Sequence, residues 1–331
     1  MRSNFPRNKI IILIFFLSAI TIPPFIGESS VKLMEAFSNP ASLSYQILFG
    51  IRLPRIAFAF LTGAGLALIG AVFQALLRND LATPYTLGVS SGGSLGAVIA
   101  IKTGLILQFF GFSTITLFSI GGSMLTISGI YWIAGRSREM NSNTLILAGV
   151  TIGLFFSSLI LFIHYLADFT ETYHMVRWLM GSLSVSGWMY PLTLLIIFLP
   201  VFFYFYRETP AFNILLASEE MALSKGVQVE RLQRVSFWLA SLLVGAIVAI
   251  AGPIGFVGLI VPHILRLLLG TDHRRLFPGV VLAGGAFLVW CDTLARTLIL
   301  PAELPVGIIT SLFGGPFFIY LLIKRQRNVM E

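Results

Sequence analysis

Three arginines stand where they could bind acidic groups. Arg52 and Arg55 lie three residues apart at the start of a long apolar segment, and Arg296 lies near the end of another. A guanidinium presents a planar set of N–H donors that pairs with a carboxylate through two hydrogen bonds. Simpler roles remain open for each residue. Arg52 and Arg55 could anchor to lipid headgroups, and Arg296 could pair with Asp292, one helical turn earlier.

A short serine motif suggests a second chemistry. Residues 88–92 read G-V-S-S-G and fit the G-x-S-x-G pattern of a serine nucleophile, which needs a strand–turn–helix elbow. Here the motif lies at the start of an apolar segment, where strings of small residues commonly allow membrane helices to pack closely. We therefore interpret Gly88, Ser90, Ser91 and Gly92 as packing residues beside a pathway. A membrane-embedded hydrolase that uses Ser90 with a histidine is the alternative.

Few other residues suggest catalysis or ligand binding. His263 is far in sequence from the other histidines, so no metal-binding spacing appears and no metal is expected. Asp292 is the one carboxylate deep in the later apolar segments, which makes it a candidate for proton coupling, but we favour a structural pair with Arg296. The sequence lacks G-x-x-x-x-G-K, so we expect no ATP hydrolysis by this chain, no enzyme activity and no bound cofactor.

The composition places these residues in a membrane protein. Of 331 residues, 56% are hydrophobic and 11% are charged, whereas soluble domains carry roughly a quarter charged residues. Apolar runs of about 20 residues recur, each long enough to cross a bilayer, and unpaired backbone groups in lipid require helices. We predict an all-α polytopic fold with about ten transmembrane helices. They are expected near 10–27, 55–77, 90–109, 113–134, 143–166, 190–206, 235–251, 256–270, 279–298 and 305–323.

The basic residues predict the topology. With the N-terminus inside, 16 of the 22 Lys and Arg fall in cytoplasmic segments, as the positive-inside rule requires. Both termini are then cytoplasmic, and Arg52, Arg55 and Arg296 are exposed on the outer side. The same rule explains the net charge of +8 without a nucleic-acid partner.

A repeated pattern suggests two halves. Residues 63–70 read GAGLALIG and residues 245–252 read GAIVAIAG, in the second and seventh predicted helices. Five helices per repeat would turn the second half over in the membrane. We therefore predict one membrane domain, 1–331, with inverted five-helix halves at about 1–185 and 186–331. Recurrent packing of small residues explains the match equally well.

The longest inner loop is rich in charge. Residues 207–234 hold 8 of the 36 charged residues of the chain. Pro210 marks the start of a short helix, and Gly226 can end one helix and let another begin. The loop is either a solvated connector or a docking element for a cytoplasmic partner.

Four stretches together resemble one known family. They read RLPRIAFAFLTGAGLALIGAVFQALLRNDLATPYTLGVSSGGSLG, LASEEMALSKGV, GPIGFVGLIVPHILRLLLGTDHR and LARTLILPAELPVGIITSLFGGPFFIYLL. This chain resembles the permease subunit of vitamin B12, iron-siderophore and haem ABC importers (FecCD-type). The resemblance implies a pathway for an iron chelate such as a ferric siderophore, with haem or cobalamin also open. It also implies a bacterial cytoplasmic (inner) membrane and surrounding lipid.

The resemblance implies partners and site residues. The partners are two cytoplasmic ATPase subunits that bind ATP and Mg, a second permease copy or paralogue, and an extracytoplasmic substrate-binding protein. Arg52, Arg55 and Arg296 match positions that meet acidic residues of the binding protein. Ser142 and Asn143 match an inner gate, or they simply cap a helix. The residues that match the ATPase-coupling motif are Leu216, Ala217, Ser218, Glu219, Glu220, Ala222, Lys225 and Gly226.

Two rival functions stay open at this stage. A secondary transporter driven by an ion gradient would need several intramembrane carboxylates or broken-helix ion sites, and the sequence offers essentially Asp292. A membrane-embedded hydrolase would depend on Ser90. The sequence does not decide between a pair of identical permeases and a pair of paralogues.

Overall fold

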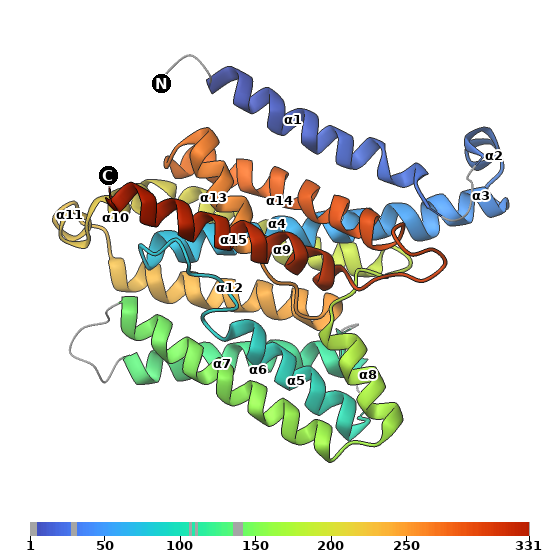
Figure 1. Ribbon diagram of the computed structural model, residues 1–331, viewed down its shortest axis with the longest axis horizontal. Helices are drawn as coiled ribbons and strands as arrows, with labels where there is room; N and C mark the ends of the chain where they lie inside the picture. Colours follow the sequence, from blue (N-terminus) through green and yellow to red (C-terminus); the bar gives the residue numbers. More distant parts are fainter. Residues whose placement is uncertain (1–4, 28–31, 106–107, 110–111, 135–141, 331) are drawn as a thin grey trace.

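The protein is nearly all helical (Figure 1). A computed structural model describes residues 5–27, 32–105, 108–109, 112–134 and 142–330. The long helices are α1 (Phe5–Thr21), α4 (Leu53–Leu76), α5 (Val89–Thr103), α6 (Thr114–Ala134), α7 (Ser142–Tyr165), α9 (Met189–Arg207), α12 (Val229–Ala251), α13 (Val257–Leu269), α14 (His273–Ala295) and α15 (Val306–Met330). Each of them overlaps one of the expected segments. Among the described residues, six helical stretches are long and apolar enough to cross a membrane.

Short elements connect the long helices. They are η1 (Pro23–Phe25), α2 (Leu33–Ser38), α3 (Leu43–Tyr45), the π-helix η2 (Gln46–Arg52), α8 (Phe169–Leu179), α10 (Thr209–Ala217) and α11 (Glu219–Ser224). Strands β1 (Gln108–Phe109) and β2 (Phe112–Ser113) form a small antiparallel pair, with Gln108 opposite Ser113.

The structure confirms a nearly all-helical protein, with the small β-pair as its one sheet among the described residues. It corrects one boundary, because the third apolar helix does not run to residue 109. It ends at Thr103 because Gly104 adopts a left-handed backbone with φ of 61° and caps the helix. Glycine takes this conformation without the steric cost that a side chain would bring.

Helix α4 lies at the centre of the bundle. It is buried along nearly its whole length and packs against α14, α13, α9 and α12. Small residues allow this close approach. A methyl group added at Gly63 would overlap the carbonyl oxygen of Gly284 in α14, and one added at Gly70 would overlap that of Gly258 in α13.

The two helices that carry the repeated pattern pack against corresponding helices of the opposite halves. Helix α4 packs along α14 and α13, whereas α12 packs along α6 and α5. In predicted order, the second helix therefore contacts the ninth and eighth, while the seventh contacts the fourth and third. Gly63 faces α14, and its counterpart Gly245 lies so close to α6 that an added Cβ would be 3.0 Å from the Ile120 Cα. The two helices also run in opposite directions (Figure 1).

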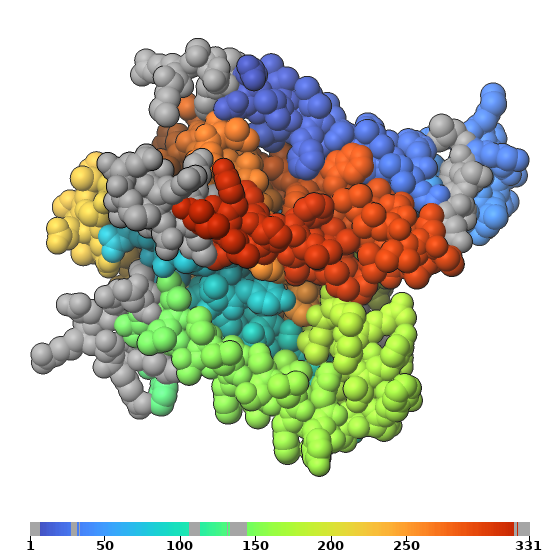
Figure 2. Space-filling model, viewed as in Figure 1, coloured from blue at the N-terminus to red at the C-terminus, as the bar shows by residue number. Residues whose placement is uncertain are grey.

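The bundle has two distinct ends. Helices α10 and α11 lie at the same end as the start of α1 and the end of α15, whereas α2 and α3 lie at the opposite end (Figure 1). In the space-filling view, the yellow segment that contains α11 lies at the surface of this end of the bundle (Figure 2). We call these the coupling end and the outer end, by the roles expected for them.

Candidate functional site

The three arginines converge at the outer end. Arg52 ends η2, Arg55 lies in the first turn of α4, and Arg296 caps the C-terminus of α14. Their relative exposures are 6%, 8% and 7%. The expectation of three exposed cations is therefore wrong. They are buried because residues far away in the sequence surround them.

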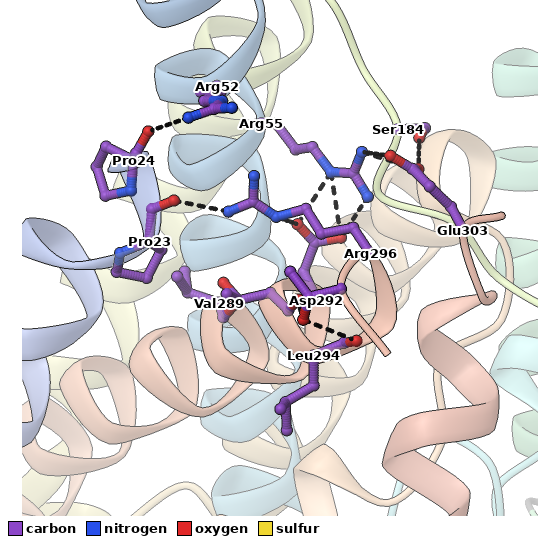
Figure 3. A network of polar contacts seen from close by, with 12 residues as sticks. Pro23, Pro24, Arg52, Arg55, Ser184, Val289, Asp292, Leu294, Arg296 and Glu303 are labelled. Atoms are coloured by element: carbon purple, nitrogen blue, oxygen red, sulfur yellow. Dashed lines mark hydrogen bonds and ion pairs between the residues drawn. The ribbon is translucent and has the colours of Figure 1, made fainter. Parts of the chain in front are cut away.

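Arg55 is held by two carboxylates (Figure 3). Its Nε lies 2.9 Å from Asp292 Oδ2, and its Nη2 lies 2.8 Å from Asp292 Oδ1. Its Nη1 lies 3.0 Å from each oxygen of Glu303. Bidentate pairs of this kind are the strong form of charge-assisted hydrogen bond. Arg55 is thus fixed between α14 and the loop that precedes α15.

The local pair expected within α14 is the weaker one. Arg296 Nε lies 3.9 Å from Asp292 Oδ2, beyond hydrogen-bond distance. Arg296 instead donates from Nη2 to the Pro23 carbonyl at 2.8 Å, and Arg52 donates from Nη1 to the Pro24 carbonyl at 3.0 Å. Both arginines therefore connect the bundle to η1, which follows α1.

Glu303 is the acid that sequence reasoning missed. Its carboxylate accepts from Ser184 Oγ at 3.0 Å as well as from Arg55, and its side chain is 44% exposed. Partial burial by itself raises the pKa of Glu303, but the charge and hydrogen bonds of Arg55, with that of Ser184, outweigh it and hold the pKa below its ordinary value. A lone glutamate in an apolar loop gave no signal of its partner 248 residues away.

A pocket of about 200 Å³ opens beside the cluster. All three arginines line it, together with Glu303 and apolar neighbours such as Leu300. A small concave site lined by guanidinium groups suits a carboxylate.

At the other end, α10 and α11 form a helix–turn–helix. Pro210 lies in the first turn of α10, as predicted. Gly226, with φ of 77°, follows the end of α11, also as predicted. An additional break occurs at Ser218, whose Oγ accepts from Met221 N at 3.0 Å and caps α11. Helix α12 begins at Val229, so the expected loop of 207–234 ends earlier than predicted.

The coupling motif exposes apolar side chains. Leu216, Met221 and Leu223 are 37%, 44% and 60% exposed, while Ala222 is buried and holds α11 to the bundle. Ala217, Glu219, Glu220, Lys225 and Gly226 are also exposed. Arg78, in the α4–α5 loop, approaches Glu219 at 3.6 Å.

A hydrogen-bonded link ties α10 to α14. Asn213 Nδ2 donates to Asp272 Oδ1 at 2.8 Å, and the backbone N of His273 donates to Asn213 Oδ1 at 2.9 Å. The Asn213 hydrogen bond, which outweighs a small effect of burial, helps to hold the pKa of Asp272 below its ordinary value. The sequence pattern did not predict this link. Its only signal was a helix-capping aspartate before His273.

The serine motif packs helices together. Ser90 is 2% exposed, and a methyl group added at Gly92 would overlap Thr126 Oγ1 in α6. Gly88 begins α5 with φ of 67° and faces the Gly149 carbonyl in α7, and Ser91 approaches Gly153. Among the hydrogen bonds of the described residues, none joins Ser90 to a histidine side chain.

Other sequence candidates fall in different places. His263 packs edge-on against Phe317 in α15, and Cys291 is buried as a packing residue, as expected. Ser142 and Asn143 begin α7, but their side chains lie outside the described part of the structure. Within the described residues, no cluster of His, Cys, Asp and Glu could hold a metal ion.

The largest cavity among those described is apolar. It measures about 870 Å³ and is lined by the α4–α5 loop, α13 and α15, with Tyr85, Phe256 and Phe318 among its aromatic residues. The residues that line it carry no charge.

Comparison with known proteins gives consistent results. A model of the FecCD transport family matches residues 10–324. The hemin transport system permease protein HmuU of Yersinia pestis is 37% identical and aligns over 86% of this chain and 85% of its own length. The vitamin B12 import system permease protein BtuC of Vibrio parahaemolyticus is 35% identical, over 96% and 94%. A solved metal-chelate type ABC transporter, in an inward-facing conformation, superposes with a TM-score of 0.86 at 32% identity, covering 97% of this chain and 100% of that one.

Proposed function

Since this chain belongs to the FecCD transport family and is an ABC importer permease of the cytoplasmic membrane, we propose that it carries an iron chelate, such as a ferric siderophore. The observation that supports this choice is the likeness along 97% of the chain to a metal-chelate type transporter. Haem and cobalamin are the alternatives, because relatives are named for them. As a permease, the chain is not itself the ATPase.

The proposed architecture has ten membrane crossings in two inverted halves, with both termini in the cytoplasm. The packing of α4 on α14 and α13 corresponds to the packing of α12 on α6 and α5. This correspondence supports the inversion, because a two-fold axis in the membrane plane would relate the two sets of contacts. The basic residues support the orientation, and the start of α1 and the end of α15 lie at the same end of the bundle (Figure 1).

At the coupling end, α10 and α11 are proposed to seat in one of two ATPase subunits, which supply ATP and Mg. Exposed Leu216, Met221 and Leu223 support this role, because the fully buried core of a protein–protein interface is more apolar than the rest of the surface. A second permease, identical or paralogous, completes the pathway. Ser142 and Asn143, at the same end, remain the proposed inner gate.

At the outer end, the arginine cluster is proposed to receive acidic side chains of a substrate-binding protein. The pocket lined by Arg52, Arg55 and Arg296 supports this role. The substrate would then pass along the uncharged cavity, with Gly88, Ser90, Ser91 and Gly92 packing the helices beside it. ATP binding must stabilise one arrangement of the helices over the other for the pathway to open alternately.

The rival functions lose their support. Both carboxylate oxygens of Asp292 are hydrogen-bonded to Arg55, a structural role that argues against ion coupling. Buried Ser90, with no histidine bonded to it among the described residues, argues against a hydrolase.

The test is ATPase activity in liposomes. The chain is reconstituted with its candidate ATPase and with a panel of binding proteins loaded with a ferric siderophore, haem or cobalamin. Stimulation by the siderophore-loaded protein alone is expected. Arg52→Glu should abolish it, while Arg177→Glu, which changes an exposed arginine on α8, should not. Uptake driven by an ion gradient without an ATPase would contradict the proposal.

A further inference from the structure

Each nitrogen of the Arg55 guanidinium already donates to a resident acid. Asp292 takes Nε and Nη2, and Glu303 takes Nη1 with both carboxylate oxygens. An acidic side chain from a docking protein needs a pair of N–H donors to bind this guanidinium strongly. It can obtain them from Arg55 only by displacing one of the two resident acids.

The two resident acids differ in how firmly they are held. Asp292 is 3% exposed and belongs to the last turns of α14, packed inside the bundle. Glu303 is 44% exposed and belongs to the loop between α14 and α15, where one hydroxyl, Ser184 Oγ, adds a second contact. Moving Asp292 would require moving a packed helix, whereas moving Glu303 requires a side chain and a loop to rearrange.

We propose that Glu303 is an internal stand-in for the docking carboxylate. It neutralises Arg55 while the permease is free, and an acidic side chain of the binding protein displaces it on docking. This inference rests on the proposed docking function of the cluster.

Charge balance supports an exchange over simple addition. Without Glu303, Asp292 would be the single carboxylate of this cluster beside three buried guanidinium groups, and buried charge that is not compensated is unfavourable. Replacing one carboxylate by another keeps the number of ion pairs constant. It also sends Glu303 into water, where its exposed position lets it be solvated without further unfolding.

Displacement of Glu303 would affect the helix that lines the large cavity. Glu303 lies three residues before α15, and Gly307, Ile308 and Ser311 in the first turns of that helix line the 870 Å³ cavity. While Arg55 holds Glu303, it also ties the loop before α15 to α4. Exchange of the carboxylates would release this restraint and thus connect docking to the wall of the cavity.

The experiment measures the Kd of the binding protein selected by the liposome panel for the permease in nanodiscs. Glu303→Gln keeps the shape of the side chain but removes its charge, so it competes less for Arg55. We expect binding about tenfold tighter, because a hydrogen bond to a charged group contributes roughly twice as much free energy as a neutral one. Ser184→Ala removes the second contact of Glu303 and should tighten binding about two- to threefold.

The matched control is Glu35→Gln. Glu35 is an exposed acid at the same outer end whose side chain contacts Ser44, and its replacement should leave the Kd unchanged. Unchanged or weaker binding by Glu303→Gln in a monodisperse, normally melting protein overturns the inference. If that variant does not fold, failure of Ser184→Ala to tighten binding overturns it equally.

Two further measurements, the salt dependence of the Kd and the Kd of Arg52→Gln, distinguish a failure of the carboxylate exchange from a failure of docking by the cluster. If wild-type binding weakens with salt and with Arg52→Gln, docking by the cluster stands whatever the Glu303 variants show. If neither changes the Kd, the docking proposal itself fails.

Discussion

The two ends of this permease bury and expose opposite kinds of side chain. At the outer end, three arginines are less than 9% exposed and are bound by acids and carbonyls distant in sequence. At the coupling end, leucine and methionine side chains of α10 and α11 are exposed, and the nearest ion pair, Arg78 with Glu219, is a long one between two side chains that are 41% and 47% exposed.

This difference indicates two kinds of contact. Ion pairs can be exchanged one for another at small cost, and exposed ion-pair contacts weaken with salt, which suits a partner that docks and leaves. Burying exposed apolar residues under a partner removes apolar surface from water and stabilises the complex, which suits a subunit that remains attached. The outer end is therefore suited to a transient partner, and the coupling end to a permanent one.

The largest effect should come from removing the buried acid. Asp292→Ala leaves Arg55 and Arg296 buried with one fewer anion, so the free energy of unfolding should fall by about 3–5 kcal/mol. Thermal melting in detergent measures the loss. Glu35→Ala, at an exposed acid of the same end, should stay within about 0.5 kcal/mol of wild type. Equal melting of the two variants would show that the outer cluster does not hold the fold.

At the coupling end, a new charge on the exposed apolar surface should weaken ATPase binding without lowering the stability of the permease. Met221→Asp and Leu223→Asp each place a carboxylate on an exposed apolar surface, so ATPase association should weaken by about tenfold or more, roughly 1.4 kcal/mol, while the melting temperature stays unchanged. Pull-down of the ATPase at graded concentrations measures this. Ser224→Asp, in the same helix, is the matched control. A variant that melts early but binds normally would reverse the contrast between the ends.

The pH dependence of Glu303 gives a smaller, directional effect. Because Arg55 holds the pKa of Glu303 below its ordinary value of 4.5, the pair stabilises the fold above that pH and loses its effect as the pH falls through the lower native pKa. At pH 7, Glu303→Gln should cost no more than about 1 kcal/mol, since the side chain is half exposed. The difference in melting temperature should shrink below pH 4.5. A difference that grew with acid would mean that Glu303 is not held as an anion.

The smallest effect is expected at the surface pair of the coupling end. Glu219→Ala breaks its 3.6 Å contact with Arg78, where both side chains are more than 40% exposed. Such pairs contribute about 0–1 kcal/mol, so stability should change by less than about 0.5 kcal/mol. A loss comparable to that of Asp292→Ala, measured in the same melting assay, would remove the distinction between buried and exposed charge on which the comparison depends.

Local patterns in the sequence predicted the helices well. Apolar runs located the long helices because lipid requires both hydrophobic side chains and paired backbone groups. Pro210 and Gly226 located the start of α10 and the end of α11 because their backbone preferences act locally. The break at Ser218 was missed, since a serine hydroxyl caps a helix only in a suitable backbone turn.

The partners of the arginines could not be read from the sequence. The i,i+4 rule offered Asp292 to Arg296, but the short contacts of Asp292 go to Arg55, 237 residues earlier in the chain. Glu303 and the link between Asn213 and Asp272 escaped notice for the same reason. Spacing along one helix predicts neighbours on that helix, whereas helix packing decides contacts between helices.

The burial of α4 also determines when this protein can be assembled. Translation proceeds at about 5–20 residues per second, so the 237 residues between Arg55 and Asp292 take roughly 10–50 s to synthesise. During that interval α4 lacks α14, so Arg55 is without Asp292 and Gly63 is not yet covered by Gly284. A ribosome stalled before α14 would leave a central helix without its packing partner. The central packing of the bundle is therefore incomplete until the ninth long helix, α14, has been synthesised.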